Sequence, residues 1–287
     1  GIRKYIDWTF FFHVWEMKGK FPEILEKEDR GEEARKLYDD AQQMLDRIIE
    51  EDILTAEAVL GIFPANSDGD DILLYEDESR NKIICRLNQL RQQTQRKSEN
   101  SYLSLSDFVA PVETEVNDYH AVFSSTAGIG LDHYIEIFEK DHDDYSIIMV
   151  KAIADRLAEA YAELLHERVR KDYWGFSTDE ELSLDDMLMA RYQGIRPAFG
   201  YPACPDHSEK EKVFNFMNIE KHTGMRITEN FSMFPAATVC AHIFGYPESR
   251  YFDVGKISKD QITDYAKRKG ISIEKAEKIL AYSLNYK

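Results

Sequence analysis

The sequence predicts a single α+β domain whose mainly antiparallel, twisted sheet is flanked by helices. Segments with strand-like composition are interleaved irregularly with amphipathic helical segments, which is typical of α+β domains. One long helical pattern runs over about residues 143–174. The chain has 287 residues, 43% of them hydrophobic and 31% charged. This composition is globular and the length is near the upper size of one compact domain, although it also accommodates two small ones.

Charge and composition exclude several classes of protein. The formal net charge is −17, from 36 basic and 53 acidic residues, so the surface repels phosphate backbones and we expect no nucleic-acid partner. No apolar run approaches the ~20 residues that span a bilayer, so we expect no membrane partner. The three cysteines lie far apart without a C-x-x-C pair. This argues against a disulfide framework or a structural zinc site and favours a cytoplasmic location.

The start of the chain suggests a fragment. It begins at Gly1 with neither an initiator Met nor a signal peptide, and it enters a patterned segment at once. We therefore expect residues 1–287 to be one domain cut from a larger multidomain chain. Asp7 lies between Ile6 and Trp8, and an acid among apolar neighbours is either a helix N-cap or a site residue. The pattern alone favours the cap.

The first half of the chain carries one clear helix and several strands. Apolar side chains recur at helical spacing over residues 29–51. The apolar run 58–63 is followed by Pro64-Ala-Asn-Ser-Asp-Gly69, a strong turn signal. The glycine-rich stretch 126–130 is not G-x-G-x-x-G, so it predicts no dinucleotide site. The remaining predictions here are strands at 71–75, 82–87 and 120–125 and a polar loop at 95–106.

The segment 143–174 is the clearest element. Its apolar residues form one stripe at helical spacing, with Asp143 at the positive end of the helix dipole and Gly175 as a natural stop. Helical spacing also places four polar side chains along one neighbouring face. They are Arg156, Glu159, Glu163 and His166. By spacing alone, such a face is usually solvated.

The segment 192–210, YQGIRPAFGYPACPDHSEK, is neither a regular helix nor a central strand, because prolines and glycines interrupt it. Its prolines stiffen the backbone, and Gly194 and Gly200 can adopt positive φ or allow a close approach. Arg196 offers a planar cation that suits a carboxylate, and Tyr201 offers an aromatic face. The segment is therefore either a plain connection or a cradle for a small zwitterion that carries a flat ring.

The last third of the chain adds short elements. Ser272 gives a capping signal for the final helix. The predicted elements are a helix at 209–222, a strand at 225–228, a β-like stretch at 232–243, a turn into a strand at 246–252, and helices at 259–269 and 272–281.

Several of these stretches resemble one family. Arg196-Pro-Ala-Phe-Gly200-Tyr201 resembles the Arg-x-x-x-Gly-Tyr signature of the activation domain of cobalamin-dependent methionine synthase. The run Tyr5-Ile-Asp-Trp-Thr9 and the helix segments around Glu159 and at 165–171 are similar to the same domain. The resemblance covers essentially the whole chain, and that domain binds S-adenosylmethionine.

The resemblance implies a set of ligand-binding residues. Arg196 would grip the carboxylate of S-adenosylmethionine, and Asp7 and Glu159 would take its ammonium or ribose hydroxyls. Aromatic rings would face the sulfonium, and backbone groups around Ala198 would read the adenine edge. Phe252 stands where family members show a second Tyr, so a hydroxyl role there stays open. The predicted set is Asp7, Glu159, Arg196, Ala198, Gly200, Tyr201, Tyr251 and Phe252.

The resemblance also implies a function, namely presentation of the methyl group of S-adenosylmethionine to cob(I)alamin during reductive reactivation of methionine synthase. The cobalamin-ligating pattern Asp-x-His-x-x-Gly is absent, so cobalamin would be carried by a separate module of the parent protein, and zinc would also lie only in the parent. The expected partners are that module and flavodoxin or a related reductase. The domain would belong to a methyltransferase and be inactive alone.

Two alternatives stay open. One is a docking module that binds no small ligand. The other is a stand-alone small-molecule enzyme that uses paired acids such as Glu159 and Glu163. The sequence shows neither G-x-S-x-G nor H-E-x-x-H, and its eight histidines lack the spacing of metal ligands. We therefore predict no catalytic residue and no metal site, and we interpret His207 as structural.

Overall fold

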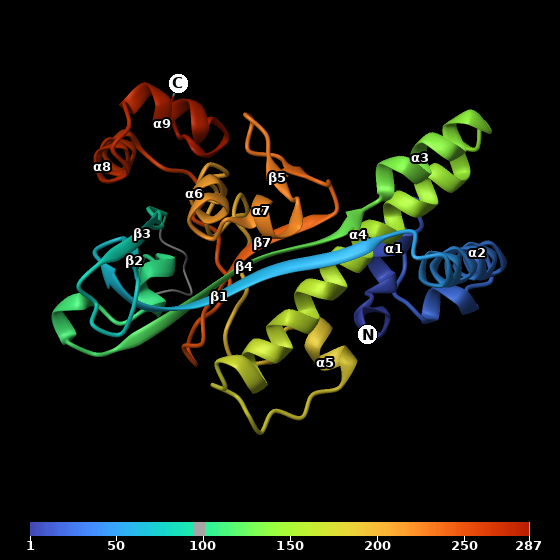
Figure 1. Ribbon diagram of the computed structural model, residues 1–287, viewed down its shortest axis with the longest axis horizontal. Coiled ribbons are helices and arrows are strands. Elements are labelled where there is room, and N and C mark those ends of the chain that lie inside the picture. Colours follow the sequence, from blue (N-terminus) through green and yellow to red (C-terminus); the bar gives the residue numbers. More distant parts are fainter. Residues whose placement is uncertain (95–100, 287) are drawn as a thin grey trace.

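The computed structural model describes residues 1–94 and 101–286, and a five-stranded antiparallel sheet lies at its centre. The strand order is β3-β2-β1-β4-β7, with helices on both faces (Figure 1). The predicted α+β class with a mainly antiparallel sheet is confirmed. The strands are β1 (Thr55–Asp68), β2 (Asp71–Tyr75), β3 (Ile83–Asn88), β4 (Asp118–Ile129) and β7 (Thr238–Ile243), with a separate pair formed by β5 (Arg226–Ile227) and β6 (Met233–Phe234).

The helices include both long ones that the apolar spacing predicts. The α-helices are α1 (Trp8–Val14), α2 (Gly31–Glu50), α3 (Leu131–Lys140), α4 (Asp144–Arg168), α5 (Leu184–Leu188), α6 (Glu209–Phe216), α7 (Ile219–Thr223), α8 (Lys259–Lys269) and α9 (Ile273–Ile279). Short 3-10 helices cover Ile2–Tyr5, Glu23–Glu26, Leu105–Phe108, Val112–Thr114 and Ala281–Ser283. Of the polar loop predicted at 95–106, residues 95–100 lie outside the described residues.

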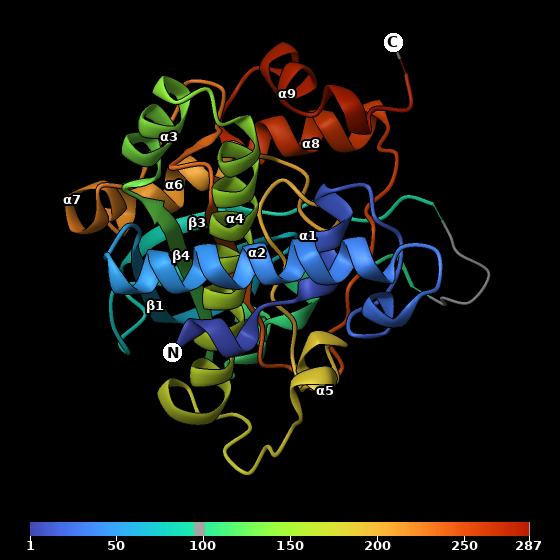
Figure 2. The ribbon, with the colours of Figure 1, turned by 90° about the vertical axis from the view of Figure 1, so that its right-hand side faces the viewer.

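The long helix α4 organises one face of the sheet. Its N-cap is Asp143, whose carboxylate accepts a hydrogen bond from the Ser146 backbone N–H at 3.0 Å, and it continues into a π-helical turn at Val169–Tyr173. Together these span the predicted helix at 143–174. Small buried side chains such as Ala154 and Ala158 let the helix approach β4 and β7 closely. In Figure 2, α2 crosses α4 on the side away from the sheet.

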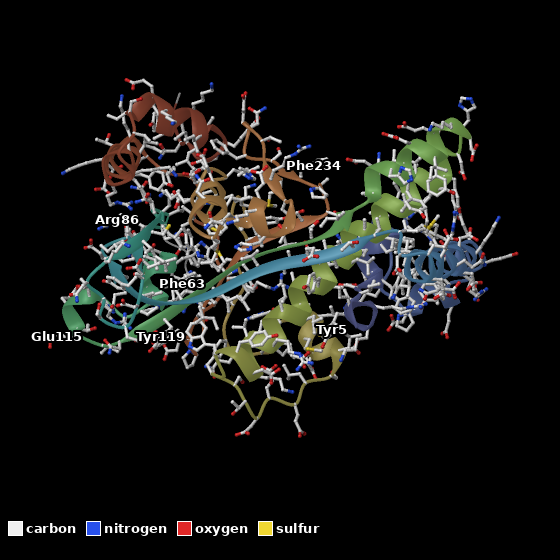
Figure 3. All side chains as sticks on the ribbon, viewed as in Figure 1. Tyr5, Phe63, Arg86, Glu115, Tyr119 and Phe234 are labelled. Carbon is white, nitrogen blue, oxygen red and sulfur yellow. The ribbon has the colours of Figure 1, made fainter. Side chains whose placement is uncertain are left out.

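Two hydrophobic cores lie on the two faces of the sheet, because neighbouring residues of a strand point to opposite sides. On β4, Ala121 and Phe123 join the cluster that includes α1, α2 and α4. Val122, between them, joins the cluster that includes α6, α7, α8 and α9. Figure 3 shows side chains packed against both faces. The sheet is therefore a buried partition between two helical layers.

The turn predicted from Pro64 is wrong. β1 continues through Pro64 to Asp68, and the turn follows at Gly69, where φ is +58°. Pro64 lies opposite Tyr119 of β4, while β2 pairs with β1 only from Ala65 onward. Pro64 therefore pairs with β4 alone, and the pairing with β2 ends before the position where it would need the missing N–H of the proline.

Two predictions in the last third of the chain are also wrong. The helix predicted at 209–222 breaks into α6 and α7, because Asn218 adopts a left-handed conformation with φ +50° that cannot continue a helix. The strand predicted within 246–252 is irregular chain. Beyond it, the Val254 N–H donates to the Pro202 carbonyl at 2.9 Å, so this region is held by the segment 192–210 and not by a strand of the sheet.

Two observations on the described residues concern membrane-spanning helices and metal-binding groups. None of the helices within residues 1–94 and 101–286 combines the length and apolar character that crossing a membrane requires. Within the same ranges, His, Cys, Asp and Glu side chains form no group of three or more arranged to hold a metal ion.

Candidate functional site

The segment 192–210, here called the site loop, lies along the outer edge of β7. The Ile195 N–H donates to the Phe244 carbonyl at 3.1 Å, and the Phe244 N–H donates back at 3.0 Å. Two residues further on, the His242 N–H donates to the Pro197 carbonyl at 3.0 Å. Pro197 accepts this hydrogen bond but has no N–H to donate in return to the His242 carbonyl, so this pair is bonded in one direction only. In this antiparallel register the backbone groups of Ala198 point away from β7.

The two glycines of the site loop are required by its shape. Gly194 has φ +88°, and a Cβ there would lie 2.3 Å from the Phe244 carbonyl oxygen. Gly200 has φ +89°, and a Cβ there would lie 2.2 Å from the His207 ring. Both glycines thus adopt the positive φ that the sequence allows. The groups that closely approach these two glycines belong to the protein and not to a ligand: the Phe244 carbonyl and the His207 ring.

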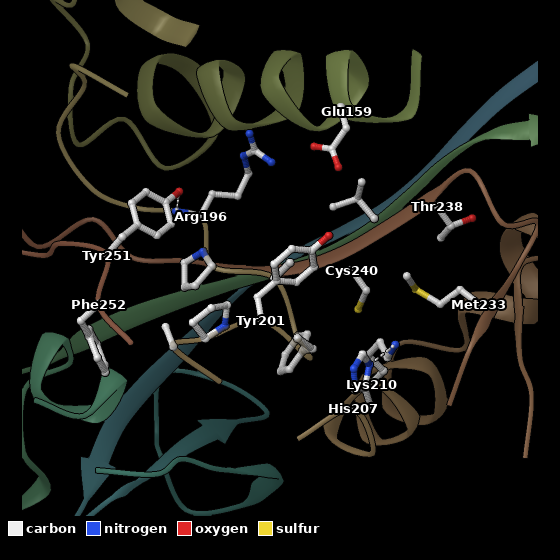
Figure 4. A pocket seen from close by; sticks show the side chains of 16 residues that line it. Glu159, Arg196, Tyr201, His207, Lys210, Met233, Thr238, Cys240, Tyr251 and Phe252 are labelled. Carbon is white, nitrogen blue, oxygen red and sulfur yellow. Dashed lines mark hydrogen bonds between the residues drawn. The ribbon is translucent and has the colours of Figure 1, made fainter. Parts of the chain in front are cut away.

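A cavity of about 510 Å³ lies between α4, the site loop and β7 (Figure 4). This volume is in the range of small-molecule sites. We call it the site cavity. It is lined by Glu159, Arg196, Pro197, Ala198, Phe199, Tyr201, Pro202, Ala203, His207, Lys210, Met233, Thr238, Val239, Cys240, Tyr251 and Phe252.

The site cavity brings together most of the residues that the sequence predicts. Those that line it are Glu159, Arg196, Ala198, Tyr201, Tyr251 and Phe252. Gly200 lies between two lining residues of the site loop and sets its turn. Asp7 is the exception, because it lines a second cavity, of about 610 Å³, with Trp8 and Tyr38. Its carboxylate accepts a hydrogen bond from the Thr9 N–H at 2.9 Å, so it is the N-cap of α1. A ligand contact of Asp7 stays a prediction.

Arg196 is paired within the protein. Its Nη2 donates to Glu163 Oε2 at 2.8 Å, and the two side chains are only 14% and 7% exposed. Its Nε is buried without a partner among the described residues. Burial lowers the pKa of Arg196, but Glu163 first, and then Tyr192, Tyr251 and Glu159, together outweigh burial and raise it. The sequence places Glu163 on the same helix face as Glu159, yet spacing does not reveal which acid meets Arg196.

The aromatic residues of the set differ in exposure. Tyr201 is 61% exposed and Tyr251 is 50% exposed, so both rings stand at the mouth of the site cavity (Figure 4). The Tyr251 hydroxyl accepts a hydrogen bond from the Arg196 backbone N–H at 2.9 Å. Phe252 is buried and packs edge-on against Phe108, with ring centroids 6.2 Å apart. Tyr201 and Tyr251 are therefore accessible from the site cavity, whereas Phe252 forms part of its buried wall.

Sequence reasoning missed the end of the site cavity opposite α4. Lys210 of α6 and Cys240 of β7 line this end, together with Met233 and Thr238. Lys210 lies in the run Glu-Lys-Glu-Lys, which is typical of a solvated helix face, so the sequence carries no signal for its burial. His207, interpreted as structural, lines the cavity and packs under Gly200.

Comparison with known proteins identifies the family of the chain. The family described as vitamin B12 dependent methionine synthase, activation domain, matches residues 1–270. A solved structure described as the MetH reactivation domain bound to AdoHcy is 50% identical, with a TM-score of 0.97. The match covers 100% of this chain and 88% of that chain. The resemblance seen in the sequence is confirmed, and the chain belongs to the family of vitamin B12-dependent methionine synthase activation domains.

Proposed function

We propose that this domain binds S-adenosylmethionine in the site cavity and presents its methyl group to cob(I)alamin during reductive reactivation of methionine synthase. One observation carries the proposal: α4, the site loop and the 251–252 segment bring most of the predicted ligand-binding residues onto a single cavity. The similar structure at 50% identity supports it, because AdoHcy is S-adenosylmethionine without the sulfonium methyl.

The chemistry of the site cavity suits such a ligand. Glu159 is exposed and stands on the α4 side, where its charge can offset a sulfonium or an ammonium (Figure 4). The faces of Tyr201 and Tyr251 can add a cation–π contact of about 0.5–2 kcal/mol. We assign the ligand carboxylate to the outer nitrogens of Arg196 and the adenine edge to the Ala198 backbone N–H, which points away from β7.

In this proposal the domain works by positioning. The site loop is bonded along β7 and its backbone is stiffened by proline, so little entropy is lost when the ligand is oriented. A separate module of the parent chain carries the cobalamin, which supplies a nucleophilic cobalt when reduced, and flavodoxin or a related reductase supplies the electron. Residues 1–287 would be one domain of that larger cytoplasmic enzyme, and any zinc would lie elsewhere in it.

Calorimetry with AdoHcy and S-adenosylmethionine tests the binding step. We expect saturable binding to the isolated domain and a rise in its melting temperature by mass action. A flat titration at millimolar ligand would contradict the proposal and favour a docking module. Methyl transfer should require an added cobalamin module and a reductant. Product formed from S-adenosylmethionine by the domain alone would instead favour a stand-alone enzyme, although the pairing of Glu163 with Arg196 leaves that acid poorly placed as a free base.

A further inference from the structure

Lys210 is a buried cation that the proposed function does not use. It lies on α6, is 4% exposed and lines the site cavity. The contact of its Nζ is with His207 Nδ1, at 3.1 Å. His207 is exposed, and both burial and the charge of Lys210 lower the pKa of its imidazole. The ring therefore accepts a hydrogen bond from the ammonium as a neutral partner and does not offset its charge.

Two other lysines of this region form ion pairs with acidic side chains. Lys212, two residues further on, pairs with Glu209 at 2.7 Å. Lys269 of α8 is 7% exposed and pairs with Asp206 at 2.7 Å. By contrast, none of the acidic side chains in the described ranges forms an ion pair with Lys210. A buried ammonium without a counterion is costly, and proteins normally avoid one unless it serves a purpose.

The position of Lys210 indicates that purpose. In Figure 4, Lys210 and His207 lie across the site cavity from Glu159. Cys240 lies beside Lys210, and burial raises the pKa of its thiol to about 12, so it stays uncharged near neutral pH. The cavity therefore has an acidic side on α4 and a cationic side on α6.

We propose that Lys210 forms, with the imidazole of His207, an anion subsite that receives a carboxylate group. The proposal rests on the ligand-binding function proposed for the same cavity. An ammonium has three donor hydrogens, and one points to His207 Nδ1, which leaves two for the oxygens of a carboxylate. The carboxylate has two possible sources. One is a separate small carboxylic acid that binds beside the S-adenosylmethionine-type ligand, whose own carboxylate then stays at Arg196 as assigned above. The other is the α-carboxylate of that ligand, which would then lie at Lys210 in place of Arg196.

The test compares Lys210→Met with a matched control. Methionine keeps the length and apolar stem of the side chain and removes the charge. Lys221→Met, on exposed α7, makes the same change in net charge away from the site cavity. Calorimetry measures the affinity of each variant for AdoHcy and for 5′-methylthioadenosine, which lacks the amino acid carboxylate. An NMR titration of AdoHcy-saturated protein with acetate, at constant ionic strength, detects a separate acid.

Two outcomes support the subsite and identify its source. If the ligand's own carboxylate is bound there, Lys210→Met weakens AdoHcy roughly ten- to a hundredfold, the scale of a charged hydrogen bond, and leaves methylthioadenosine unchanged. If a separate acid is bound there, AdoHcy affinity is unchanged, while acetate shifts cavity resonances in wild type and in Lys221→Met but not in Lys210→Met. In both cases the ligand-free Lys210→Met protein melts higher than wild type, because an unpaired buried charge is gone.

Two outcomes overturn the subsite. In one, Lys210→Met leaves AdoHcy, methylthioadenosine and acetate responses all unchanged. In the other, it lowers the melting temperature and weakens both nucleosides equally, which is the result for a purely structural lysine. Failure of the proposed function looks different, because wild type itself would then bind neither AdoHcy nor methylthioadenosine.

Discussion

The ion pair between Arg196 and Glu163 allows a sharp test, because removing either partner leaves a buried charge. Substituting Arg196 alone mixes two effects, a loss of ligand contact and a loss of stability. We therefore consider Arg196→Met, Glu163→Leu and the double variant together. Breaking a buried pair by removing one partner costs about 3–5 kcal/mol, whereas replacing both partners with apolar side chains is often nearly neutral.

The size of the expected effect follows from the burial and the chain length. With about 2.1 cal/mol/K of unfolding entropy per residue, 287 residues give about 0.6 kcal/mol/K. Each single variant should then melt about 5–8 °C below wild type, and the double variant should recover most of this difference. Thermal and urea unfolding of the four proteins measure the coupling free energy directly. Arg168→Met is the matched control, because its pair with Asp172 has side chains 56% and 45% exposed and should cost less than about 1 kcal/mol.

The ligand arm of this experiment uses the double variant, which should stay folded. If Arg196 meets the carboxylate of the ligand, that variant binds AdoHcy roughly ten- to a hundredfold more weakly and binds methylthioadenosine as wild type does. The reasoning about the pair is refuted if each single variant loses less than about 1 kcal/mol and the coupling free energy is near zero. The reasoning about the ligand is refuted if the folded double variant keeps its full affinity for AdoHcy.

Three further predictions concern pH and the site loop. Burial lowers the pKa of His120 from 6.5 to about 3 and also lowers the pKa of His242, to which it is hydrogen-bonded, so the unfolded chain takes up these protons first. Each of the two should reduce the free energy of unfolding by about 1.4 kcal/mol per pH unit below about pH 6.5. When both are replaced by Asn, the loss of unfolding free energy between pH 7 and pH 5, measured with urea, should be smaller. Gly200→Ala should lower both stability and AdoHcy affinity, because the added Cβ would collide with the His207 ring. Gly224 also has positive φ, but no atom lies within 4 Å of an added Cβ, so Gly224→Ala should show only the smaller cost of backbone strain. Equal melting temperatures of the two variants would contradict the predicted collision with His207. Tyr251→Phe keeps the ring but removes the hydroxyl that accepts a hydrogen bond from the Arg196 backbone N–H. AdoHcy should then bind several-fold more weakly, and the free energy of unfolding should fall by less than about 1.5 kcal/mol. Unchanged affinity in calorimetry would argue against a role of that hydroxyl.

The parts of the fold that the sequence predicts well are those with a strong period. The apolar stripe over 29–51 corresponds to α2, whose buried residues follow the same spacing. The stripe over 143–174 corresponds to α4, which is also buried beyond the stripe, for example at Ala152, Ala160 and Ala162. The strands at 71–75, 82–87 and 120–125 also lie close to their predicted positions. In these elements local preference and burial agree, so one signal suffices.

The errors come from positions where long-range contacts override a local signal. Pro64 reads as the start of a turn, but tertiary pairing with β4 keeps it in a strand, and the pairing between β1 and β2 ends at Ala65, one residue short of Pro64. Asn218 has no strong signal as a helix break, yet its left-handed backbone separates α6 from α7. Neither outcome follows from neighbours in the sequence, because each depends on what packs there.

The candidate site shows the same division. The Arg-x-x-x-Gly-Tyr signature predicts the residues of the site loop that line the site cavity, because a family signature is read residue by residue. Ion pairs are not read in this way. Glu163 is buried against Arg196, and Lys210 is buried without an acid, because of the way α4 and α6 pack around the site cavity. The sequence therefore predicts which residues line the site cavity better than it predicts their charge state or partners.

The two acids of α4 show why this distinction matters for the chemistry. Glu159 and Glu163 are four residues apart on one helix face, so the sequence treats them alike. In the structure Glu163 neutralises Arg196, and Glu159 is left exposed at the site cavity. The net charge of these three groups is −1 with or without the ion pair, but the pair places the uncompensated charge on Glu159, the acid that lines the site cavity. A net negative wall attracts a sulfonium more than it attracts a neutral thioether, and this difference is the one between S-adenosylmethionine and AdoHcy. Neutralising Glu159 should therefore weaken S-adenosylmethionine more than AdoHcy, and a ratio of affinities unchanged in Glu159→Gln would show that the charge of this wall does not act on the sulfur.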